Sequence, residues 1–157
     1  MIIDNLFLRQ MTKEDLSFVN STRNISSTRK WLENNNEISL EDTKKWFLKN
    51  KPNWHVIFFK EKPVGYIRTS DDTKKSICVG CDIHPNFRRK GIARKSYSIF
   101  LESLYEEGYV NIWLDVFKEN EPAYKLYESL GFIPIGSRIV REKIYVTMVH
   151  KRGEKIE

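Results

Sequence analysis

The spacing of apolar residues changes along the chain, and each spacing predicts a different kind of element. Residues 54–83 contain three runs rich in β-branched and aromatic residues, WHVIFFK, VGYIRTS and SICVGCDI, separated by the turn sequences EKP and DDTKK. Short runs punctuated by turn signals predict strands paired in an antiparallel meander. The apolar residues that come next have the i, i+3, i+4, i+7 spacing of a helix: Tyr97, Phe100, Leu101 and Leu104.

The other segments alternate between helical and extended patterns. Strands are expected at residues 6–9, 111–117, 132–138 and 143–150, and helices at residues 12–24, 28–32, 39–49 and 121–130. Thr12 followed by Asp15 has the pattern of a capping box, and Ser39 is the expected N-cap of its helix. This order predicts an α/β domain with a mixed, mostly antiparallel sheet, helices on its faces and a group of helices inserted after the first strand.

Length and composition are those of one globular domain. A chain of 157 residues with 40% hydrophobic and 31% charged residues is long enough to bury a core, and no linker or repeat divides it. We expect one domain over residues 1–150 and a polar tail at 151–157. No apolar run approaches the roughly 20 residues that span a bilayer. The N-terminus MIIDNLFLRQ lacks a secretory pattern, so a cytoplasmic location is expected.

Cys78 and Cys81 form a CVGC spacing that also occurs in redox and zinc sites. A redox pair normally opens a helix, whereas SICVGCDI has the pattern of a strand, in which residues three apart point to opposite faces. No second pair in the sequence completes a zinc site. We therefore expect two reduced structural thiols and no metal.

The sequence HPNFRRKGIARKS, residues 84–96, places a glycine within a cluster of cations where a helix begins. The first N–H groups of a helix lack internal partners and attract anions, and Gly91 and Ala93 remove side-chain bulk in front of them. With a formal net charge of +6, the chain favours an anionic partner. The segment predicts a phosphate site, although a basic helix start on a solvated surface explains it equally well. It is neither a Walker loop nor a G-x-G-x-x-G turn.

A second segment, WLDVFKENEPAYKLYESLGF at residues 113–132, adds to the first. Together, IHPNFRRKGIARKS and VFKENEPAYKLYESLGF resemble the two signature segments of the GNAT N-acetyltransferases in order and spacing. The resemblance covers roughly residues 54–149. It implies the GNAT fold, with a central sheet splayed in the middle and helices on both faces, and transfer of an acetyl group from acetyl-CoA to an amine.

The resemblance assigns roles to individual positions. The pyrophosphate of coenzyme A would be held mainly by main-chain N–H groups of the loop: Arg89, Lys90, Gly91, Ile92, Ala93 and Arg94. Arg88 occupies the family's Gln/Arg position among the cofactor-binding residues. The pantetheine arm would pair with Cys81, Asp82 and Ile83, where Gly80 is expected to produce a bulge. Asn120 matches the family asparagine that contacts the cofactor, and Tyr127 matches the tyrosine that serves as general acid.

The expected chemistry is direct attack of a free amine on the thioester. A main-chain N–H near Ile83 would stabilise the oxyanion. A hydroxyl such as that of Tyr127 would give its proton to the departing thiolate. Asp115 is the candidate base, because WLDVFKEN resembles the WLxVxxxN segment of ribosomal-protein acetyltransferases, which hold a glutamate there. The alternatives are that Tyr127 is packed in a core and that Asp115 is hydrogen-bonded within the sheet. The base would then be a water chain or a histidine, His55 or His84.

The N-terminal half is expected to select the acceptor. Its LFLRQMTKEDL opening, RN pair and helix ending in WF resemble acetyltransferases of nucleotide-linked aminosugars, ribosomal proteins, polyamines and antibiotics. Six residues are the predicted acceptor-binding set: Arg23, Asn24, Arg29, Trp31, Trp46 and His55. Arginine suits a diphosphate and tryptophan the face of a sugar. Tryptophans packed in the core and arginines on a solvated face are the alternative.

Three functions are therefore open at this point. The favoured one is an acetyl-CoA-dependent N-acetyltransferase acting on a small amine such as a nucleotide-linked aminosugar. The second is a protein N-terminal or lysine acetyltransferase, which would need an open groove for its acceptor. The third is a basic module that binds nucleic acid or another anion, but aromatic residues are not interleaved with its cations. The expected partners are acetyl-CoA and an amine, with no nucleic acid or membrane, in a monomer or homodimer.

Overall fold

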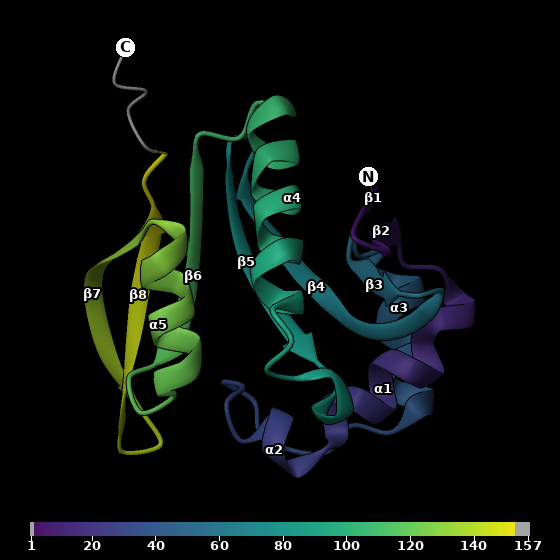
Figure 1. Cartoon of the computed structure of the whole chain (residues 1–157). Coiled ribbons are helices and arrows are strands. Elements are labelled where there is room, and N and C mark those ends of the chain that lie inside the picture. The colour runs from purple at the N-terminus through teal and green to yellow at the C-terminus, as the bar shows by residue number, and fades with distance from the viewer. Residues whose placement is uncertain (1, 153–157) are drawn as a thin grey trace.

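The structure is a computed structural model that describes residues 2–152, except for the side chains of residues 2 and 3. An eight-stranded sheet forms its centre, in the order β1-β2-β3-β4-β5-β6-β8-β7. Only β5 and β6 pair in parallel; all other neighbours are antiparallel. Figure 1 shows α4 and α5 on one side of this sheet and α1, α2 and α3 toward the other. The expected α/β class with a mixed sheet is confirmed.

The N-terminal part contains two strands and the inserted helices. Its elements are β1 (Ile2–Ile3), β2 (Leu6–Gln10), a 3-10 turn (Lys13–Asp15), α1 (Leu16–Asn24), α2 (Ser26–Arg29) and α3 (Leu40–Asn50). The capping box is confirmed, because the Asp15 carboxylate accepts a hydrogen bond from the Thr12 N–H at 2.8 Å. Ser39 caps α3 as expected. The short helix expected at 28–32 instead begins at Ser26 and ends at Arg29.

The middle part is the predicted meander: β3 (His55–Phe59), β4 (Lys62–Thr73) and β5 (Ser76–Ile83). The C-terminal part contains α4 (Ile92–Glu106), β6 (Asn111–Phe117), α5 (Glu121–Leu130), β7 (Phe132–Val140) and β8 (Lys143–His150). Most of these bounds agree with the sequence patterns. The predicted tail, residues 151–157, lies mostly outside the described residues.

The sheet splits between β5 and β6. Their parallel ladder joins only Ser76–Cys78 to Asn111–Trp113, and the strands diverge beyond it (Figure 1). The bulge expected at Gly80 is absent, since β4 and β5 stay in register from Gly65 to Asp71. Gly80 has a different role: a Cβ there would lie 2.5 Å from an amino group of Arg68, whose side chain crosses this position.

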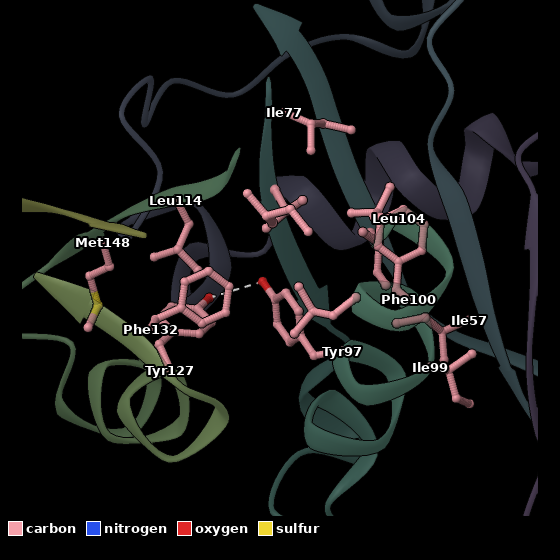
Figure 2. Packing of buried hydrophobic residues seen from close by; sticks show 14 of the residues in the cluster. Ile57, Ile77, Tyr97, Ile99, Phe100, Leu104, Leu114, Tyr127, Phe132 and Met148 are labelled. Carbon is pink, nitrogen blue, oxygen red and sulfur yellow. Dashed lines mark hydrogen bonds between the residues drawn. The ribbon is translucent and has the colours of Figure 1, made fainter. Parts of the chain in front are cut away.

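Two apolar clusters cover the faces of the sheet. The larger one joins α4 and α5 to the strands and includes Tyr97, Tyr127 and Phe132 (Figure 2). The smaller one lies under α1 and α3 and includes Val56 and Tyr66. In the described residues, no helix is long and apolar enough to cross a membrane.

Candidate active site

A cleft of about 560 Å³ lies on the face of the sheet that α1 covers, next to the split. Its walls come from α1, the segment after α2, strands β4 to β8 and one residue of α5. The lining residues used below are Arg23, Trp31, Glu33, Trp54, Tyr66, Arg68, Asp72, Cys78, Gly80, Trp113, Asp115, Tyr127, Arg138 and Tyr145.

Strand alternation explains how most of these residues meet. Tyr66, Arg68, Ser70 and Asp72 are two apart on β4, so their side chains share one face. Trp113 and Asp115 have the same relation on β6, while Ile112 and Leu114, which alternate with them, enter the core. Cys78 lines the cleft and Cys81 packs against the opposite core, so the two thiols point to opposite faces as expected. Both are free, and burial raises the pKa of Cys78 to about 11.

Tyr127 reaches the cleft from the other side of the sheet. It is on α5, only 8% exposed, and stacks edge to face against Tyr97 with ring centroids 5.5 Å apart. Tyr97 donates a hydrogen bond to the Tyr127 hydroxyl over 3.4 Å, which leaves the proton of Tyr127 itself uncommitted (Figure 2). Burial raises the pKa of Tyr127 to about 12, so this hydroxyl is protonated at neutral pH. A protonated phenol at the split can act as an acid.

Asp115 lies across the cleft and is already engaged. Its Oδ1 accepts a hydrogen bond from Thr147 at 2.5 Å, and its Oδ2 is 3.4 Å from Arg138. These contacts are the ones expected for the alternative role, in which Asp115 is an acid hydrogen-bonded within the sheet. Its predicted role as base stays a prediction.

Residues 30–34, called the strap, close one side of the cleft. From the β7–β8 hairpin, Arg138 pairs with Glu33 at 3.1 Å, and Arg141 donates to main-chain carbonyls of Leu32 and Glu33. From α1, Arg23 donates to the Asn34 carbonyl at 2.8 Å. The strap thus connects both halves of the molecule across the cleft.

The loop before α4 has the features of an anion site. Gly91 is the N-cap of α4 with φ +75°, and Arg89 also has a positive φ of 62°. A Cβ on Gly91 would meet nothing within 4 Å among the described residues, so an approaching anion finds open space. No side chain in the described part of the chain caps this helix, which leaves its first N–H groups for a ligand. Lys90 and Arg94 are exposed beside it.

Other predicted cofactor residues differ in their surroundings. Arg88 is bound elsewhere, because its guanidinium donates to Ser27 and Thr28 at 3.0 and 2.8 Å, linking the loop to α2. Asn120 is the N-cap of α5, and its side chain makes no capping bond to the described residues. Residues 81–83 lie beyond the β5–β6 ladder, where the strand edge is open toward the split.

Only two of the six predicted acceptor residues, Arg23 and Trp31, line the cleft. The other four lie outside its lining. The Asn24 side chain donates through Nδ2 to the Ile38 carbonyl and accepts at Oδ1 from the Ile38 N–H. Arg29 donates to the carbonyls of Asn24 and Asn35. Trp46 packs behind Trp54, with ring centroids 4.7 Å apart. His55 lies on β3 against Phe100, on the opposite face.

Several lining residues are not among those predicted from the sequence: Trp54, Tyr66, Arg68, Asp72, Trp113, Arg138 and Tyr145. In VGYIRTSDD, Tyr66, Arg68, Ser70 and Asp72 occupy every second position, with the core residue Ile67 between two of them, and this alternation would have identified the β4 residues. Arg138 and Tyr145 depend on the hairpin geometry and carry no such signal. No group of three or more potential metal ligands occurs within the described residues.

Comparisons with known proteins agree with this arrangement. Residues 19–132 match the Acetyltransferase (GNAT) family. A ribosomal protein bS18 alanine N-acetyltransferase of Salmonella typhimurium is 35% identical over 65 residues, 41% of this chain. The matched part spans 42% of the length of that relative.

Two solved structures resemble the whole fold. A spermidine N-acetyltransferase from Vibrio cholerae, in complex with CoA and spermine, has a TM-score of 0.85 and 22% identity, covering 94% of this chain and 95% of that one. AAC(6′)-Ib in complex with ribostamycin and coenzyme A has a TM-score of 0.80 and 22% identity, covering 95% and 94%. At such identity the likeness shows a shared fold.

Proposed function

The chain belongs to the acetyltransferase (GNAT) family, and from this membership we propose that it transfers the acetyl group of acetyl-CoA to the primary amine of a small molecule. The observation that carries the proposal is the position of the split. At the split, the basic loop and the helix that carries Tyr127 lie toward one face of the sheet, and the cleft lies on the other face. A donor bound along the loop and the open edge of β5 would meet an amine held in the cleft.

The residues present fit coenzyme A. The uncapped start of α4 and the bare, left-handed Gly91 would take the pyrophosphate, and Arg89, Lys90 and Arg94 would add positive charge. Arg88 would act indirectly, since it fixes the loop to α2. Asn120 and the edge of residues 81–83 would hold the arm. Acetyl-CoA supplies the activated acyl group.

Tyr127 is the proposed acid and Asp115 the proposed base or orienting group. The hydroxyl of Tyr127 gives a proton to the leaving sulfur, because it is protonated at neutral pH and not used as a donor to Tyr97. The amine loses its proton to Asp115 or to water beside it. Since both oxygens of Asp115 are engaged by Thr147 and Arg138, its carboxylate also orients Arg138.

The strap supports a small acceptor over a protein. A peptide needs an open groove, whereas Arg23, Arg138 and Arg141 hold residues 30–34 across the acceptor side. Aromatic side chains such as Trp31 and Trp113 would cover a sugar or another flat group. A nucleotide-linked aminosugar, the acceptor indicated by the N-terminal half, fits this description.

The test is release of the coenzyme A thiol from acetyl-CoA with a panel of amines: aminosugars and their nucleotide derivatives, polyamines, aminoglycosides and peptides. We expect turnover with a small amine and thermal stabilisation by coenzyme A. Turnover with peptides alone would replace the small acceptor by a protein. Absence of both stabilisation and thiol release would contradict the proposal.

A further inference from the structure

The floor of the cleft contains hydrogen-bond donors that no described residue uses. Nε of Arg68 donates to Asp82 at 3.0 Å, but its two terminal amino groups have no partner within residues 2–152. The hydroxyl of Tyr66, two residues earlier on the same face, is fully buried and makes no well-formed hydrogen bond within residues 2–152, although the Asp82 carboxylate lies near it. Native structures leave few buried polar groups unpaired, so the Tyr66 hydroxyl requires an explanation, while the partly exposed amino groups of Arg68 face the cleft. A ligand that enters the cleft would provide it.

The direction of Arg68 is fixed by its neighbours. The pair with Asp82, which is 8% exposed, holds Nε, and the guanidinium lies over Gly80, where any side chain would collide with it. About a third of the Arg68 side chain is exposed, toward the cleft. A guanidinium held by Nε presents its two amino groups as a fork, and this fork matches the two oxygens of a carboxylate or a phosphate.

Charge is distributed unevenly over the cleft. On the floor, Arg23 and Arg68 face a single carboxylate, that of Asp82, and Arg23 is bonded to main-chain carbonyls rather than to an acid among the described residues. Near β6, Arg138 pairs with both Glu33 and Asp115, and Asp72 of β4 accepts a hydrogen bond from Trp113. The floor is therefore positive and the opposite side negative.

We propose that the acceptor is a small molecule that carries an oxyanion, a carboxylate or a phosphate, in addition to the amine that is acetylated, and that Arg68 and Tyr66 bind this oxyanion. The amine of such a zwitterion lies toward the negative side, near Asp115 and Tyr127. This inference rests on the proposed function, because it names the substrate class of the same cleft. Arg68 and Tyr66 belong to the acceptor half, since both line the cleft rather than the loop before α4.

The experiment compares amines that differ only in the oxyanion, at constant ionic strength. Suitable pairs are glucosamine with glucosamine 6-phosphate, and an amino acid with its carboxamide; spermidine serves as a cation without an oxyanion. For each, kcat/KM is measured by thiol release. The dissociation constant is measured by calorimetry on the complex with coenzyme A, or on the free chain if coenzyme A does not bind. The two pairs distinguish a phosphate from a carboxylate ligand.

Two variants remove the proposed contacts separately. Tyr66→Phe deletes a buried hydroxyl that lies near Asp82 without a well-formed hydrogen bond, and Arg68→Lys keeps the charge but loses the fork. We expect the preference for the oxyanion-bearing member of a pair to fall about tenfold in Tyr66→Phe and about 10- to 100-fold in Arg68→Lys. Tyr105→Phe is the matched control, because the Tyr105 hydroxyl bonds to His150 away from the cleft. This control leaves the preference unchanged.

Each outcome decides the inference. A preference of the unchanged chain for the oxyanion-bearing amine, lost in both variants, supports it. Equal binding of both members of every pair, acceptance of spermidine alone, or a preference that survives in both variants overturns it. The proposed function fails on a different result, namely no stabilisation by coenzyme A and no thiol release with any amine. Because calorimetry needs no turnover, the inference is decided even then.

Discussion

Replacing Tyr127 by phenylalanine tests the proposed proton donor directly. The substitution removes one oxygen and keeps the ring, which packs against Tyr97 and Phe132 with centroids 5.5 and 5.8 Å away. The fold loses one hydrogen bond of 3.4 Å. A bond this long contributes little, so the free energy of unfolding should change by no more than about 1 kcal/mol. For a chain of this length, that corresponds to about 2–4 °C in Tm.

The effect on turnover should be far larger. General acid catalysis contributes about 10²- to 10⁴-fold, or about 3–5 kcal/mol of transition-state free energy. Because the hydroxyl is proposed only as an acid, the affinity for acetyl-CoA should stay nearly constant while kcat falls. Thiol release under saturating acetyl-CoA gives kcat, and calorimetry gives the dissociation constant of the cofactor.

Tyr97→Phe is the matched control for this substitution. It removes the same hydrogen bond from the same aromatic pair but leaves the hydroxyl of Tyr127 in place. We expect a loss of less than about tenfold in kcat, because the acid is retained. Equal losses in the two variants would mean that the shared hydrogen bond matters rather than the proton of Tyr127, and undiminished turnover in Tyr127→Phe would assign the proton to another group.

Three further predictions concern the loop, the strap and the response to pH. Gly91→Glu should abolish coenzyme A binding in calorimetry, whereas Gly108→Glu, at a position with a similar positive φ and equally open space, should retain it; binding by both would refute the anion site. Arg141→Gln removes the bonds to the strap carbonyls and should raise KM for the acceptor several-fold without changing KM for acetyl-CoA; equal shifts in both would argue against a role of the strap in acceptor binding. Burial raises the pKa of Tyr127 to about 12, above its unfolded value, so this tyrosine stabilises the fold fully below about pH 10 and the contribution is lost as pH rises toward 12. In urea titrations over this window, the free energy of unfolding should fall less steeply with pH in Tyr127→Phe than in the unchanged chain, by about 1.4 kcal/mol per pH unit; parallel curves would contradict the assignment.

Most helices and strands could be predicted from the sequence because each one has a local cause. Ser39 and the Asp15 capping box begin helices, Gly131 ends α5 with a φ of 99°, and the periodic apolar residues of α4 are all buried. The split and the loop were also predictable, but through family motifs. Their geometry then differed in detail, since Arg88 bonds to α2 and Gly80 makes room for Arg68 instead of a bulge.

The acceptor cleft was less predictable for a physical reason. Its walls come from segments distant in sequence, such as Glu33 and Arg138, which pair across 105 positions. An arginine or tryptophan has the same appearance in sequence whether it lines a cleft or supports a loop. Trp46 and Arg29 were assigned to the cleft on residue type alone, yet Trp46 packs behind Trp54 and Arg29 holds main-chain carbonyls.

The parallel ladder of three residues on each strand has a consequence for how the molecule opens. Strands β1 to β5 form one antiparallel set and β6 to β8 another, so few main-chain bonds join the two. Each set is then a candidate cooperative unit for amide hydrogen exchange, with the seam at Cys78 and Trp113. A ligand bound along this seam would contact both units. When it is added, amides on both sides should become protected from hydrogen exchange together.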